Sequence, residues 1–259
     1  MRRIYRILSF VPLLYLMAVP VYFAITSFSR PCSGVNITLA DSSDFTFVTK
    51  NEITNLVYSK GKDPAGMPVK DLMMSDMEER IHGLRELKTA EVYVSVDGLL
   101  NVFAEQRNPV MRVMPSSGGD FFVDEEGVVI RRRHLYNPRL HIVGGNVNIS
   151  RKMLDGVSIF DTSIKNTILR DIYHLVKYIN SDSFWSAQID QIYVDAYDEI
   201  DLIPRVGNHV IHFGTTADME DKFRNLSAFY EKVLPEVGWN NYSHINIEFK
   251  DQIVCRRRN

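Results

Sequence analysis

The sequence predicts an α+β protein, and three patterns support this class. Apolar and polar residues alternate at 92–96 and again at 100–104, on either side of Asp97-Gly98, which is typical of a β-hairpin. Between 164 and 180, apolar residues recur at three- and four-residue spacing, as on one face of a helix. After Pro109, most of the chain consists of short strand-like runs separated by turns. The second part is therefore expected to be mainly antiparallel β structure with flanking helices.

The hairpin centred on Gly98 is expected to close with a three-residue loop. A two-residue loop would place Val92 and Val94 on the opposite face from Leu100 and Val102. A three-residue loop, with Gly98 in the left-handed conformation, sets Val94 opposite Leu100 and Val92 opposite Val102. All four aliphatic side chains then share one face, so we predict this register.

Composition indicates a globular protein and argues against nucleic acid as the main partner. The 259 residues can bury one or two cores, and the charged and hydrophobic fractions of 24% and 45% are ordinary. A net charge of -2 lacks the basic excess that phosphate binding requires. The two cysteines, Cys32 and Cys255, show no metal-binding spacing, and we expect both to be free thiols.

The N-terminus predicts a membrane anchor. Arg2, Arg3 and Arg6 precede an uncharged run at 7–28, which as a helix would be about 33 Å long, enough to cross a bilayer core. The arginines favour a cytoplasmic position for residues 1–6 and export of the rest. The alternative is a cleaved signal peptide, but the run is long for one and no small-x-small site follows it cleanly.

Residues 32–107 predict a small unit with two helices on one face of a three-stranded sheet. A strand is expected at 35–39, and the hairpin described above supplies the other two. Between them, Thr49–Glu52 and Ser75–Glu78 both read as capping boxes, each opening a helix. The second helix is expected to turn Met77, Ile81 and Leu84 inward.

Residues 108–259 predict a second, strand-rich unit. Strands are expected at 111–114, 121–123, 128–130, 140–143, 189–194, 200–203, 209–213, 245–249 and 252–256. Helices are expected at 164–180 and 218–234, and Thr215 or Thr216 is expected to cap the second. Gly144-Gly145-Asn146 and Lys250-Asp251 are expected to form turns.

The candidate catalytic and metal-binding patterns have simpler structural explanations. Ser59–Lys62 fits S-x-x-K, but the S-D-N and K-T-G elements that this chemistry needs are missing, so a helix end is favoured. His209 and His212 lie three apart on a strand and point to opposite faces, so they cannot share a metal ion. The carboxylates at 195–201 and 124–126 sit where strands must be joined, which favours solvated turns. We therefore expect no catalytic residue, cofactor or metal.

Five stretches together resemble a known family. In order, they are AEVYVSVDGLLNVFAEQRNPVMRV, FFVDEEGVVI, IDQIYVDAYDEIDLIPRVGNHVIHFG, DMEDKF and YSHINIEFKDQIVCRR. Their order and spacing are similar to those of the bacterial cell-division family FtsQ (DivIB), and the short cytoplasmic segment and the Q-R-N-P-V junction look most like Bacteroidota versions. The resemblance implies a POTRA domain at 32–107, an FtsQ-type β domain at 108–259, and a non-enzymatic scaffold of the division septum. Such a scaffold would be a single-pass inner-membrane protein with its bulk in the periplasm.

The resemblance also implies partners. These are FtsB and FtsL, with FtsK, FtsW and the septal transpeptidase FtsI as further candidates; the POTRA domain is linked to recruitment and the last strands to FtsB. An edge strand leaves backbone groups unpaired, and a partner can add a strand there. The residues carried over as partner-binding are Tyr242, Ile247, Phe249, Gln252, Ile253 and Val254. Alternation would place about half of the apolar ones in the core instead.

Alternative interpretations remain for the whole chain and for its end. A membrane-tethered POTRA transport or sensor protein would usually carry repeated POTRA units or many barrel strands. A cell-wall enzyme would need converging polar groups in a cleft. Arg256–Arg258, which departs from the family's ending in being basic and without an aromatic residue, reads either as a solvated end or as a contact for an acidic partner.

Overall fold

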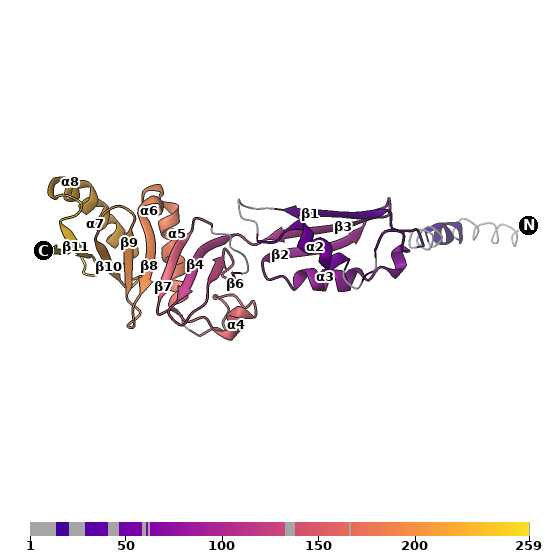
Figure 1. Ribbon diagram of the computed structural model, residues 1–259, viewed down its shortest axis with the longest axis horizontal. Coiled ribbons are helices and arrows are strands. Elements are labelled where there is room, and N and C mark those ends of the chain that lie inside the picture. The colour runs from indigo at the N-terminus through magenta and orange to yellow at the C-terminus, as the bar shows by residue number, and fades with distance from the viewer. Residues whose placement is uncertain are drawn as a thin grey trace, which may run out of the picture. The chain divides into compact units, whose positions relative to one another are not determined.

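The protein comprises two compact units (Figure 1). A computed structural model describes residues 14–20, 29–40, 47–58, 61, 63–132, 138–165 and 167–258. The units are Met1–Arg107 and Asn108–Asn259. Residues 14–20 are helical, whereas the rest of the span expected at 7–28 and the segment 1–6 lie outside the described residues. Within the described part of the chain, no helix is both long and apolar enough to cross a membrane.

The first unit contains the expected three-stranded sheet with two helices. Its strands are β1 (Gly34–Ala40), β2 (Leu87–Val94) and β3 (Leu99–Gln106), and its helices are α2 (Lys50–Val57), the 3₁₀ turn η1 (Val69–Asp71) and α3 (Met74–His82). The sheet order is β1-β3-β2, with β1 parallel and β2 antiparallel to β3. Figure 1 shows α2 and α3 lying along this sheet. Ile53 and Ile81 from the helices are fully buried, as is Leu100 from β3.

The predicted hairpin register is confirmed. Val92 pairs with Val102 and Val94 with Leu100. Gly98 has φ +84°, the left-handed conformation that closes a three-residue loop at no steric cost. Val96 lies in that loop and is almost fully exposed, so β2 ends at Val94, two residues before the end of the alternating run 92–96.

One of the two expected capping boxes is present. Thr49 accepts from the backbone of Glu52, and the Glu52 carboxylate accepts from the backbone of Thr49 at 2.8 Å. The expected box at Ser75 is wrong, because α3 begins at Met74 and Met73 is its N-cap. The turn η1 leads directly into α3, which leaves Ser75 inside the first helical turn. Leu84 follows the end of α3 and is half-buried.

The second unit is built on a nine-stranded mixed sheet. Its strands are β4 (Pro109–Pro115), β5 (Phe121–Asp124), β6 (Val129–Arg131), β7 (His141–Gly145), β8 (Ile189–Val194), β9 (Ile200–Pro204), β10 (Val210–Gly214), β11 (Tyr242–Asn246) and β12 (Val254–Arg257). The order is β12-β11-β10-β9-β8-β7-β4-β5-β6. Among the described strands, pairings β4–β7, β7–β8 and β10–β11 are parallel and the other five are antiparallel. The sheet is therefore mainly antiparallel, as expected, with three parallel pairs: helices connect β7 to β8 and β10 to β11, whereas β4 and β7 are connected through β5 and β6.

Helices bury one face of this sheet. They are α4 (Arg151–Leu154), α5 (Ile168–Ser181), α6 (Ser183–Gln188), α7 (Met219–Lys232) and α8 (Leu234–Val237). Leu169, Ile172 and Val176 of α5 share a core with Ile192 of β8 and Leu202 of β9. Strand residues that alternate with these core residues point to the other face, which is only partly shielded from solvent.

Local hydrogen bonds explain why the start of α5 and the presence of α6 differ from the sequence-based prediction. Helix α5 starts at Ile168 rather than Ile164, because the Thr167 side chain accepts from Leu169 N and caps it. The unexpected α6 begins after Asp182, whose carboxylate accepts from the backbone of Phe184 and Trp185.

Backbone conformation explains the other differences. Helix α7 has Asp218 as N-cap, at φ +52°, and neither expected threonine caps it. Gly144 and Gly145, expected in a turn, are the last residues of β7.

The turn at Asp124 was expected to be solvated, which is wrong for Asp124 itself. This residue is 2% exposed, and its Oδ1 accepts from the backbone N–H groups of Glu126 at 2.9 Å and Val128 at 2.7 Å. The carboxylate thus holds the β5–β6 hairpin closed, as an aspartate commonly does in a tight turn.

Two buried histidines should make the second unit less stable in mild acid. Burial lowers the pKa of His209, whose Nε2 lies 2.7 Å from Tyr230 Oη. Burial also lowers the pKa of His141, although the hydrogen bond between His141 and Asn180 acts in the opposite direction. Below about pH 6.5 the unfolded chain therefore binds protons that the folded chain does not, so stability falls until the folded-state pKa is reached.

Unfolding in urea at pH 7.5 and pH 5 measures this loss. Both tryptophans, Trp185 and Trp239, lie in the second unit, so their fluorescence reports on that unit alone. His209→Asn should reduce the pH dependence, whereas His244→Asn, at an exposed position, should leave it unchanged. Equal pH dependence in wild type and His209→Asn would contradict the assignment.

Candidate functional site

Strand β12 is the outermost strand at one end of the nine-stranded sheet. Among the described residues it pairs only with β11. The strand at the opposite end, β6, has Val129 and Ile130 at 2% and 0% exposure. On β12, Val254 is 51% exposed. The two ends of the sheet therefore differ, and the β12 end is the accessible one.

The strand register fixes which β12 side chain points to which face. Ile245 of β11 is fully buried and lies opposite Cys255, which packs against the core with Ile253. Val254 lies opposite Asn246, on the face that the helices do not cover. Because side chains alternate along a strand, Arg256 shares that open face and Arg257 points to the helix side.

The expected final hairpin is shorter and its loop longer than the sequence suggests. The expected strands 245–249 and 252–256 become β11 and β12, joined by residues 247–253. The chain does not turn at once after Asn246, because Ile247 N continues the pairing with β10 by donating to His212 O at 3.0 Å. Asp251, with φ +59°, lies where the turn was expected.

The six residues carried over as partner-binding fall into three groups. Phe249 and Val254 are exposed, at 49% and 51%, and Gln252 is also exposed. Tyr242 and Ile253 are half-buried and pack against the core. Ile247 is 2% exposed and belongs to the core, so it cannot contact a partner. The alternation that separates these groups was foreseen, but the assignment of Ile247 to a contact surface is wrong.

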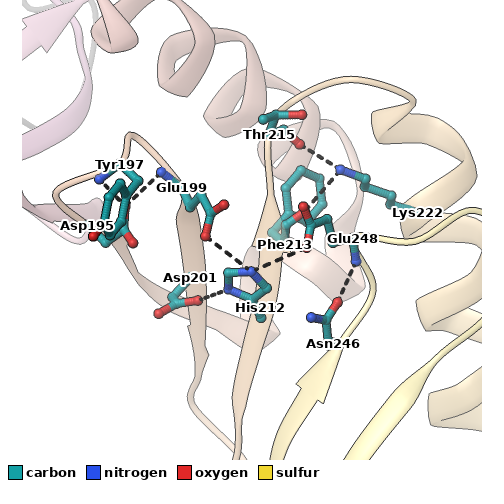
Figure 2. Close-up of polar contacts among 10 residues, drawn as sticks. All are labelled: Asp195, Tyr197, Glu199, Asp201, His212, Phe213, Thr215, Lys222, Asn246 and Glu248. Carbon is teal, nitrogen blue, oxygen red and sulfur yellow. Dashed lines mark hydrogen bonds and ion pairs between the residues drawn. The ribbon is translucent and has the colours of Figure 1, made fainter.

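A polar cluster around His212 lies on the open face beside the β11–β12 loop (Figure 2). Asp201 Oδ1 is 2.8 Å from His212 Nδ1. Glu199 Oε2 and Glu248 Oε2 are 3.6 and 3.7 Å from Nε2. Local sequence patterns do not predict this cluster, because the parallel pairing of β10 with β11 is what brings Glu248 close to His212. Three carboxylates around one imidazole make this surface acidic.

The neighbouring groups in Figure 2 have structural roles. Asp195 Oδ1 accepts from the backbone of Tyr197 at 2.7 Å and of Glu199 at 2.9 Å, which closes the β8–β9 turn. Lys222 of α7 donates its Nζ hydrogens to Phe213 O at 3.0 Å and Thr215 O at 2.8 Å. Burial lowers the pKa of Lys222, and nearby Glu248 opposes this shift. The acidic segment 195–201 therefore forms the β8–β9 turn and the first residues of β9, where the sequence predicted that two strands are joined.

The other candidate metal-binding and catalytic residues named from the sequence do not form a site in the described part of the chain. His209 faces Tyr230, whereas His212 faces Asp201, so the prediction that they point apart is confirmed. Within the described part of the chain, no group of three or more His, Cys, Asp or Glu residues could hold a metal ion. Cys32 and Cys255 are both free thiols, as expected. Ser59, Lys60 and Lys62 of the S-x-x-K pattern lie outside the described residues.

Comparison with protein families identifies both units. A family model described as FtsQ/DivIB, C-terminal related, matches residues 108–256. The chain belongs to the FtsQ/DivIB family. A POTRA-like domain model matches residues 30–105, which agrees with the two helices and three-stranded sheet of the first unit. The comparison with curated proteins found no match. Membership of the FtsQ/DivIB family indicates a role in cell division.

Proposed function

We propose that this protein is a non-enzymatic scaffold of the bacterial division machinery, and that a strand of FtsB, with FtsL in the same complex, adds to the open edge of β12. In this role it would link early and late division proteins and help to recruit or control septal peptidoglycan synthesis. Family membership supports the division role, and the exposed β12 edge supports the mode of binding.

The observation that carries the proposal is the exposure of β12 at the end of a well-packed sheet. An added strand would hydrogen-bond to the backbone of β12, and its side chains would meet those of β12 on both faces. Exposed Val254 and, in the preceding loop, Phe249 supply apolar surface beside that backbone. A β-strand is the partner shape that uses both features together.

The membrane anchor belongs to the proposal as well. Arg2, Arg3 and Arg6 precede the uncharged run 7–28, which favours a single-pass helix in the inner membrane with residues 1–6 in the cytoplasm and both units in the periplasm. The Q-R-N-P-V junction favours a member from Bacteroidota. Anchoring would confine the β12 edge to the layer where FtsB and FtsL are also found.

Further contacts are proposed from the family resemblance alone. FtsK, FtsW and FtsI are the candidates, and the POTRA-like unit is the proposed recruitment module. A single POTRA-like match precedes the FtsQ/DivIB match, and the cluster at His212 is a partly exposed network of ion pairs. We therefore prefer the scaffold to a transport protein, a sensor or a cell-wall enzyme.

Depletion of the protein tests the cellular role. Cells that lose it should continue to elongate without completing septa, and a fluorescent fusion of the full chain should concentrate at the division site. Phase-contrast and fluorescence microscopy measure both effects, and expression of the wild-type chain from a second locus should restore division. Normal septation in fully depleted cells would refute the proposed function.

A further inference from the structure

The β12 edge carries two arginines, Arg256 and Arg257, whose charges have no partner among the residues that the structure describes. Arg256 and Arg257 are exposed. Among the described residues, neither guanidinium has a hydrogen bond or an ion pair. Arg256 is held through its backbone: it pairs with His244 of β11, and Ser243 Oγ donates to Arg256 O at 3.2 Å. Next along the chain, Arg258 differs because its guanidinium donates to Asn208 O.

Three other arginines of the second unit form ion pairs with aspartates. Arg112 and Arg132 both lie 2.6 Å from Asp120, and hydrogen bonds from these two outweigh burial and lower the pKa of that carboxyl. Arg205 lies 2.8 Å from Asp190. Arginines in the interior of the sheet are thus paired with carboxylates, whereas Arg131 on β6, like Arg256 and Arg257, has no such partner among the described residues; β12 differs in carrying two such arginines at consecutive positions.

The register places the two unmatched charges on opposite faces of the same edge. Arg256 lies opposite His244 on the open face, and Arg257 lies opposite Tyr242 on the helix side. A strand added outside β12 would place one side chain beside each arginine, at consecutive positions. A carboxylate at each position could then pair with an arginine that the fold leaves unpaired.

Near the start of β12, the neighbouring surface is negatively charged. Glu248 in the preceding loop lies by His212, together with Glu199 and Asp201. A strand that was acidic along its whole length would be repelled at this end. The charges of the edge thus favour one register, in which the acidic part of the partner lies at Arg256 and Arg257.

We infer that the strand bound at β12 is acidic where it passes Arg256 and Arg257, and neutral or basic where it passes Val254 and the β11–β12 loop. This inference rests on the proposed function, because it presumes that a partner strand occupies the edge. It adds the charge pattern of that strand and the side chains that select it. The same two arginines would disfavour pairing of a basic strand at this edge.

Charge reversal tests the inference. The full chain in detergent is immobilised, and the exported part of FtsB from the same organism is the probe, measured by biolayer interferometry at 50 and 500 mM NaCl. For wild type, affinity should fall at high salt because the ion pairs are exposed. The double variant Arg256→Glu, Arg257→Glu should bind at least about 30-fold more weakly at low salt and lose most of the salt dependence. Arg256→Lys, Arg257→Lys should keep most of the affinity.

A matched control separates the edge from general charge effects. Arg131→Glu reverses an exposed arginine on β6, at the opposite end of the same sheet, and should bind as wild type does. If Val254→Lys weakens binding and the double arginine variant does not, the charge pattern is wrong and the edge proposal stands. If wild type fails to bind FtsB, or Val254→Lys binds normally, the edge proposal itself fails.

Discussion

Replacing Val254 by lysine should weaken the proposed binding of FtsB about 100-fold, or about 2.7 kcal/mol, while the protein remains folded. Val254 is half exposed on the outermost strand, and its side chain points to the face that the helices do not cover. A lysine there can extend into water in the free protein. In the complex the charge would have to lie against the added strand, which is how natural edge strands resist pairing.

The matched control for Val254→Lys is Tyr193→Lys. Tyr193 is 46% exposed and lies on the same cross-strand row, which runs from Val254 through Asn246, His212 and Asp201. It is on β8, in the interior of the sheet, where no strand can be added. Affinity measured by biolayer interferometry should therefore be unchanged. Equal losses in both variants would indicate that the partner covers the open face rather than the edge.

Ile253 is a poor position for the same test. Charge substitution at Ile253 is the obvious choice from the sequence, but this residue is half-buried and packs against the core. A charge there would disturb the fold of the second unit as well as the edge. Val254 separates the two effects, and tryptophan fluorescence of the variant confirms that the unit is intact.

Gly145→Ala should destabilise the second unit by about 3 kcal/mol or more. Gly145 ends β7 with φ +96°, a conformation that residues with a Cβ rarely adopt. A Cβ at this position would lie 2.0 Å from Val194 O and 2.9 Å from Val194 N. Both are backbone atoms of the neighbouring strand β8, so β7 and β8 would have to separate where the sheet is parallel.

Gly144→Ala provides the control one residue away. The atoms nearest to a Cβ at Gly144 are 3.9 Å distant, which is ordinary van der Waals contact, and φ is not in the left-handed region. Urea unfolding followed by tryptophan fluorescence should show a lower midpoint for Gly145→Ala and little change for Gly144→Ala. A Gly145→Ala midpoint equal to that of wild type would contradict the assigned backbone conformation.

Local patterns in the sequence were sufficient where neighbours along the chain determine the structure. The hairpin at Gly98 follows from two alternating runs and one turn, so even its loop length could be predicted. The Thr49 capping box needs only four residues. The Ser75 pattern failed because α3 already begins at Met74, so that Ser75 lies within the helix and Met73 is the N-cap.

Local patterns in the sequence could not predict the contacts between segments that are distant along the chain. Glu248 meets His212 because β11 runs parallel to β10, a pairing that nothing near either residue specifies. Ile247 reads as part of an alternating terminal strand, yet it continues along β10 and enters the core. The accessible β12 edge likewise depends on the order of all nine strands.

By itself, the sequence determined the α+β class, the two helices and three strands of the first unit, and the likeness to the FtsQ/DivIB family. The class and the elements follow from periodicity and turn chemistry, which act over a few residues, whereas the family likeness rests on the order and spacing of five stretches. Only the tertiary structure decided that β12 is the open end of the sheet and that Val254 faces outward while Ile247 is buried. It also decided that Arg256 and Arg257 have no carboxylate partner in the described part of the chain. The physical reason is that burial and charge pairing depend on which strands become neighbours, and the long-range packing of the core sets that order.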